Sequence, residues 1–324
     1  MKDHLALFIV HCAFLVLTVL FYSIEMIAIG KKANQPLLRS AFNFLFCTGA
    51  ILSFLYEGCF TITVAVPFVP NFSFPQIEGK REWFKIVHGL AFLSSSCQDY
   101  LCAALAANRL TAAAAGNRHE KWWKFIGVFA FFIILAGPSI ALWPLFLSDL
   151  EVVLLSVGEG RVAYVTSYSA LHNGHDLSLR LWSSVAVGGG LSAIFIIITT
   201  IWMVVRDQSP YATSNAASHE RMLCLYTIVA SIINSSVAAA QVYMATEVDV
   251  SVLSWHYAAP WLVHLKCLSP ALLILAFSKP LRLKVKTLLK FPSSIVSPPS
   301  VPLSNFSSVV PFHAQRTTSR GMYF

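Results

Sequence analysis

Three ionisable residues stand inside long apolar stretches of the chain, namely Glu57, Asp99 and Lys266. Insertion scales put each such side chain at roughly 2.5 to 3.5 kcal/mol against insertion at mid-membrane, which favours pairing of opposite charges at similar depth. At a helical rise of about 1.5 Å per residue, Glu57 and Lys266 both lie roughly 14 Å from the same end of their helices, and Asp99 lies about one turn deeper. We therefore predict an ion pair between Glu57 and Lys266, with Asp99 as a second acceptor.

A buried group of charges has two possible uses, and the sequence leaves both open. The charges could form a structural clamp that holds helices together. They could instead line a polar cavity that orients a ligand, or exchange partners between two states. His11 and His264 fall at similar depth and could line the same cavity. Glu25 lies near the opposite end of its helix, so we expect its carboxylate to extend toward the water beside Lys31.

The remaining reactive side chains give no comparable signal. All seven cysteines fall inside apolar stretches without Cys-x-x-Cys spacing, which favours packing roles over a disulfide or a zinc site. His172 and His175 stand close together but have no obvious ligand partners. A membrane enzyme would need a matched set of reactive groups at one depth, and none is evident. We expect no catalytic residue, no metal and no cofactor.

The elements that must position these charges are seven apolar stretches, each longer than the roughly 20 residues that a helix needs to cross a bilayer. The composition agrees, because 56% of the residues are hydrophobic and only 12% are charged, whereas soluble domains carry about 25% charged residues. The sequence therefore predicts an all-α membrane protein with a seven-transmembrane helix bundle. The predicted spans are 5–29, 41–66, 86–107, 125–147, 181–205, 222–246 and 257–278.

The basic residues predict the orientation of this bundle. Most of the 23 Lys and Arg residues lie on the side that holds the C-terminus, so the positive-inside rule places residues 1–4 outside the cell and the C-terminus in the cytoplasm. The net charge of +8 is therefore a membrane signal and does not imply nucleic acid. After the last span, 279–290 reads as an amphipathic basic helix facing lipid phosphates, and 291–324 as a disordered tail rich in Ser and Pro.

Two further sites follow from this orientation. Asn108 and Arg109 end the third span at the cytoplasmic face, and Glu220 begins the sixth span there as a plausible partner for the arginine. An arginine at this position also simply obeys the positive-inside rule, so the pair could be a coupling site or a topology signal. Asn71 begins an Asn-x-Ser glycosylation sequon close to the outer end of the second span, where we expect it to be unoccupied.

Three short motifs carry a resemblance to a known family. Asn-Arg-Leu-Thr-Ala at 108–112, His-x-Lys-x-Trp at 119–123 and Phe-Ser-Lys-Pro-Leu-Arg at 277–282 resemble the nematode serpentine chemoreceptors, the class gamma group and its relatives above all. The resemblance implies a G-protein-coupled chemosensory receptor in the plasma membrane of sensory neurons. Its partners would be a small-molecule ligand and a heterotrimeric G protein.

The chain departs from rhodopsin-like receptors, because Asn108 replaces the acid usual before that arginine and the seventh span lacks an Asn-Pro-x-x-Tyr motif. Two other functions stay open on the residues. A membrane transporter would also use charged residues at the midplane, although the chain shows no internal repeat. A retinal-binding, opsin-like photoreceptor could use Lys266 as its Schiff base with Glu57 as the counter-ion.

Overall fold

The computed structural model describes nine segments of the chain, and all statements on structure refer to them. The loops between these segments and everything after Leu289 lie outside the described residues, as do the sequon at Asn71 and the predicted tail. The described segments are 2–30, 41–65, 81–115, 118–147, 150–156, 162–168, 174–207, 215–246 and 252–289.

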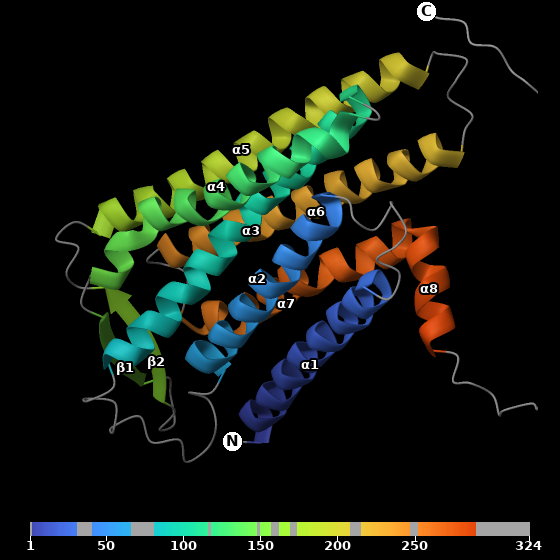
Figure 1. The fold of residues 1–324 in the computed structure, drawn as a ribbon. Helices are drawn as coiled ribbons and strands as arrows, with labels where there is room; N and C mark the ends of the chain where they lie inside the picture. The colour runs from blue at the N-terminus through green and yellow to red at the C-terminus, as the bar shows by residue number, and fades with distance from the viewer. Residues whose placement is uncertain are drawn as a thin grey trace, which may run out of the picture. The chain divides into compact units, whose positions relative to one another are not determined.

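Seven long helices make up the bundle in the described part of the chain (Figure 1). Each predicted span falls on one of them, although the second also covers the turn after α2 and several helices extend beyond the predicted ends. The helices are α1 (Lys2–Gly30), α2 (Ala41–Phe60), α3 (Arg81–Ala115), α4 (His119–Leu147), α5 (Gly174–Asp207), α6 (Asn215–Thr246) and α7 (Val252–Phe277), and a π-helical turn, η2 (Thr61–Ala65), continues α2.

Six of these helices are long and apolar enough to cross a membrane, and α3 is not among the six. The middle of α3 carries Ser94, Ser95, Ser96, Gln98 and Asp99, which lower its hydropathy. The same helix packs against α2, α4, α5 and α6, and Figure 1 shows it in the middle of the bundle. A helix that is enclosed by other helices can hold such polar residues because protein, not lipid, surrounds them. The count of seven spans and the orientation of the termini stay predictions.

The outward faces of the peripheral helices are apolar, as contact with lipid requires. On α4, Phe125, Phe129 and Ile140 are each more than two-thirds exposed. In α1, α4 and α5 only 22% of the most apolar window is buried inside the bundle, against 61% in α2. These three helices therefore present most of their apolar surface to the surroundings, which a bilayer would cover.

Glycines let α4 and α5 approach α3 closely. A Cβ atom on Gly137 of α4 would stand 2.7 Å from the ring of Tyr100, and one on Gly188 of α5 would stand 3.0 Å from the Cβ of Asp99. A larger residue would force the Tyr100 ring at Gly137, or the backbone of α3 at Gly188, to move. Small residues at helix contacts are a general feature of membrane bundles, because they increase van der Waals contact.

Two elements lie outside the bundle helices. Strands β1 (Leu150–Ser156) and β2 (Val162–Tyr168) pair antiparallel between α4 and α5, whereas the sequence predicted an all-α protein. Helix α8 (Lys279–Leu289) follows α7 directly and contacts both α1 and α7, as Figure 1 shows. Its Leu281 is buried, and Val285 and Leu288 pack against the core, whereas Leu283 and Leu289 are exposed, so one face of α8 meets the bundle.

Candidate functional site

Lys266 is fully buried in α7 and is bound by α3. Its Nζ atom donates to Asp99 Oδ1 at 3.0 Å, to Ser95 Oγ at 2.9 Å and to the backbone oxygen of Ser95 at 3.1 Å. An ammonium has three N–H donors, so this site satisfies all of them. Ser95 and Asp99 are four residues apart and therefore lie on one face of α3. The lysine thus joins α7 to α3 through three hydrogen bonds.

The predicted pair between Glu57 and Lys266 is therefore wrong, and Asp99 is the acid that binds the lysine. Glu57 instead accepts a hydrogen bond at 2.7 Å from Nδ1 of His264. The reason is angular: His264 and Lys266 are about 200° apart around α7, because each residue turns a helix by about 100°. Equal depth placed the two charges in one layer of the bundle, but Lys266 faces α3 while His264 faces α1 and α2.

A chain of three side chains joins α1, α2 and α7. His264 Nε2 lies 2.8 Å from His11 Nδ1, and the other ring nitrogen of His264 reaches Glu57. Phe14 stacks on the His264 ring with a centroid distance of 4.7 Å, and Trp261 meets the His11 ring edge-on at 5.9 Å. The five residues predicted for the outer site therefore form two groups, one with Asp99 and Lys266 and the other with Glu57, His264 and His11. Each group contains one residue of α7.

Each group leaves polar atoms without a partner. Glu57 Oε2, His11 Nε2 and Asp99 Oδ2 are buried and have no hydrogen-bond partner among the described residues. A buried polar atom without a partner costs roughly 1 to 3 kcal/mol, more when it is charged. Buried polar atoms of this kind usually bond to ordered water or to another bound molecule.

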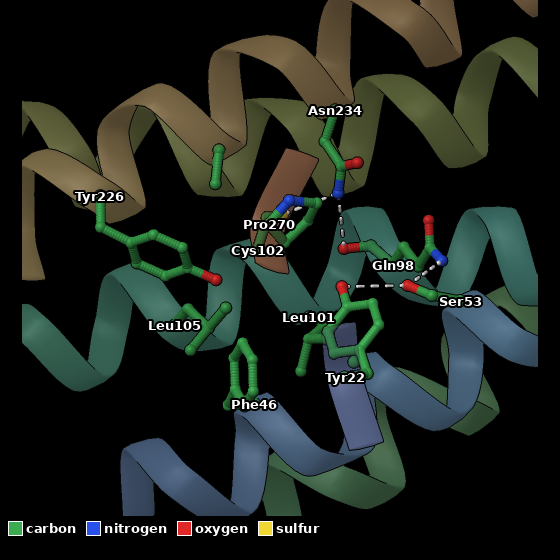
Figure 2. Close-up of a pocket in the computed structure, with 12 residues that line it drawn as sticks. Tyr22, Phe46, Ser53, Gln98, Leu101, Cys102, Leu105, Tyr226, Asn234 and Pro270 are labelled. Carbon is green, nitrogen blue, oxygen red and sulfur yellow. Dashed lines mark hydrogen bonds between the residues drawn. The ribbon is translucent and has the colours of Figure 1, made fainter. Parts of the chain in front are cut away.

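Below this layer, a small cavity lies between α1, α2, α3, α6 and α7. Its volume is about 30 Å³. This is room for roughly two water molecules and is far below the roughly 300 Å³ of a typical ligand site. In Figure 2, Gln98 donates to Ser53 Oγ at 3.2 Å, and Asn234 points at Cys102, with Nδ2 at 2.9 Å from Sγ. Tyr22 donates to the backbone oxygen of Cys267 at 3.1 Å. The hydrogen bonds around this cavity join helices, and the cavity itself is too small for a ligand. It was not predicted from the sequence.

At the predicted coupling face, Asn108 and Arg109 are buried at the end of α3. Arg109 donates to Asn108 Oδ1, and its guanidinium lies over the Phe42 ring of α2 at 4.7 Å from the centroid. Glu220 belongs to α6, but its side chain lies outside what the structure describes. The proposed contact between Arg109 and Glu220 therefore stays a prediction.

Glu25 corrects a further expectation. Its side chain does not extend toward water but is completely buried in α1, and neither carboxylate oxygen has a hydrogen-bond partner among the described residues. The neighbouring Tyr22 and Ala28 belong to the same packed core, which shields this side of α1. A position four residues from the end of an apolar stretch does not show which way the helix faces, so the sequence could not reveal the burial.

The apolar helices and their enclosed polar interior define a multi-pass membrane protein. A family model described as Srg family chemoreceptor matches residues 8–285. Because this match covers most of the chain, the protein belongs to the Srg family of nematode serpentine chemoreceptors. A search of curated proteins finds no match. The resemblance seen in the three short motifs is thereby confirmed.

Proposed function

We propose that this chemoreceptor binds a small molecule at the outer half of the bundle and signals through a heterotrimeric G protein in the cytoplasm. The proposal includes a plasma membrane location in a sensory neuron, with the N-terminus outside. The family supports a chemosensory receptor. The proposal goes further on two groups of residues, one beside the middle of α3 and the other near its C-terminal end.

The proposed ligand site consists of the two buried groups, one formed by Asp99 and Lys266 and the other by Glu57, His264 and His11. Their supporting features are full burial, aromatic walls from Phe14 and Trp261, and three polar atoms without partners among the described residues. A ligand that hydrogen-bonds to those atoms would change the contacts of α7 with α1, α2 and α3 at once. A purely structural clamp would have the same geometry but would not respond to any ligand.

The proposed coupling face consists of Asn108, Arg109 and Glu220. Arginine suits this role because its guanidinium keeps its charge when buried and can bind carbonyl or carboxylate groups of a partner with several hydrogen bonds.

The single observation that carries the proposal is that α3 contributes residues both to the proposed ligand site and to the proposed coupling face. Asp99, in the ligand site, and Arg109, in the coupling face, are about 15 Å apart along one continuous helix. A shift of α3 caused at Asp99 would therefore displace Arg109 as well. Packing of α3 against four other helices makes it the element through which such a shift would spread.

The test is a G-protein activation assay in cells that express the receptor, screened with volatile and water-soluble small molecules. Lys266→Met should abolish or weaken the response to any active compound, while Lys124→Met, at an exposed position of α4, should keep it. Equal, wild-type responses of both variants would refute the ligand site. Substrate uptake without signalling would favour a transporter, and a visible absorbance band with bound retinal would favour an opsin-like photoreceptor.

A further inference from the structure

A chain of hydrogen bonds joins the cytoplasmic end of α3 to the start of α4. Asn108 Nδ2 lies 3.3 Å from Nε2 of His119, whose Nδ1 lies 3.2 Å from the hydroxyl oxygen of Thr111. The indole nitrogen of Trp123 donates to the same hydroxyl at 2.6 Å. Asn108, His119 and Trp123 are buried, so these bonds are shielded from water.

The donor and acceptor roles depend on the His119 tautomer, and one tautomer satisfies every bond in this chain. A guanidinium only donates, so the Asn108 atom that faces Arg109 is the carbonyl oxygen, and the amide nitrogen donates to His119 Nε2. His119 then carries its proton on Nδ1 and donates it to Thr111. The Thr111 hydroxyl accepts this bond and the indole N–H, and donates its own proton to the backbone oxygen of Ala107 or Asn108, each at 3.0 Å. A hydroxyl has one proton and two lone pairs, and all three are used.

We propose that Thr111, His119 and Trp123 are positioning residues that hold Asn108, and through it Arg109, in the resting conformation of the receptor. In this conformation Arg109 is bound to Asn108 and covered by the Phe42 ring, with only 3% of its surface exposed. An arginine that is hidden in this way cannot reach a cytoplasmic protein. Release of Asn108 is therefore a condition for Arg109 to be presented.

The inference rests on the proposed function, because it assigns the three residues a role in the availability of Arg109 for coupling. It adds that α4 takes part in this control through its first turns. Breaking the chain at Thr111 or Trp123 should shift the population from the resting toward the coupling-competent state. A single hydrogen bond of ordinary strength corresponds to a shift of roughly two- to tenfold in such an equilibrium.

The test compares basal nucleotide exchange on a panel of purified heterotrimeric G proteins in the presence of the full-length receptor without ligand. Thr111→Val keeps the size of the side chain and removes the hydroxyl, and Trp123→Phe removes the indole N–H; both should raise basal exchange roughly two- to tenfold. Thr111→Ser restores the hydroxyl and should return exchange to the wild-type level. The matched control is Trp122→Phe, at a neighbouring position that is 50% exposed.

The double variant Thr111→Val with Trp123→Phe provides a second criterion. Because both changes break the same bond, its exchange rate should not exceed that of the more active single variant by more than the scatter of the assay. Thermal unfolding of the same purified proteins should show lower midpoints for Thr111→Val and Trp123→Phe than for Trp122→Phe and Thr111→Ser.

The two proposals fail in different ways. If the wild type promotes exchange and Thr111→Val and Trp123→Phe behave like Trp122→Phe, the positioning role is refuted while coupling stands. If no protein, wild type or variant, promotes exchange on any G protein while the unfolding midpoints shift as expected, the chain of bonds is only a structural joint. That result would overturn the coupling proposal and the positioning role together.

Discussion

Replacement of Lys266 by methionine should destabilise the receptor strongly. The change removes the ammonium but leaves Asp99 and Ser95 buried at the contact between α3 and α7. Removal of one partner from a buried ion pair costs about 3 to 5 kcal/mol, because the other charge is left uncompensated. At about 2 °C per kcal/mol for a chain of this size, the midpoint of thermal unfolding should fall by roughly 5 to 10 °C.

A second substitution distinguishes the true partner of the lysine. When Lys266→Met is combined with Asp99→Asn, the orphaned charge disappears, so most of the lost stability should return. Glu57→Gln should not rescue Lys266→Met, because Glu57 binds His264. The assay is thermal unfolding of receptor purified in detergent, with Lys124→Met as the exposed control. Equal rescue by Glu57→Gln, or an unchanged midpoint for Lys266→Met alone, would refute the assignment of the pair.

Three other substitutions test the packing of the bundle. Gly188→Ala should lower the unfolding midpoint because its Cβ would meet the Cβ of Asp99 at 3.0 Å, whereas Gly190→Ala, with open space around it, should be neutral or stabilising; equal midpoints would contradict the close approach of α5 to α3. Glu25→Leu should raise the midpoint, because it removes a buried carboxyl group that has no hydrogen-bond partner among the described residues, and a lower midpoint would show that the carboxyl group has a partner. Asn234→Leu should lower the midpoint by removing the bond to Cys102 Sγ at 2.9 Å, and a neutral result would mean that the bond adds nothing to stability.

The sequence predicted the helices well because hydropathy reports directly on the solvent around a helix. Each predicted span lies in a long helix, and the family confirms the serpentine receptor type. The hairpin of β1 and β2 was not predicted, because its first strand reads as a short apolar run without alternation. Helix α3 packs against four other helices, yet it is the least apolar of the long helices because of its polar centre. This is the expected pattern for a helix that is enclosed by protein.

The candidate site was predictable in its members but not in its pairing. Ionisable residues are rare in apolar stretches, so Glu57, Asp99 and Lys266 could be identified as site candidates from the sequence. The choice between Asp99 and Glu57 as partner of the lysine depends on the rotation of α7 about its axis. A helix that is apolar on all sides has no sequence periodicity that reveals this rotation. The buried position of Glu25 was missed for the same reason. The bonds of His119 with Asn108 and Thr111 depend on how α3 and α4 pack together, which the sequence does not reveal.

The separation of Asp99 from Lys266 along the chain has a consequence for synthesis. The two residues are 167 positions apart, so at about 5 to 20 residues per second a ribosome completes the lysine roughly 8 to 33 s after the aspartate. Throughout that interval Asp99 lacks the partner that it has in the folded bundle. The contact between α3 and α7 therefore forms late in the assembly of the bundle, and other contacts must hold α3 in place until the lysine is made.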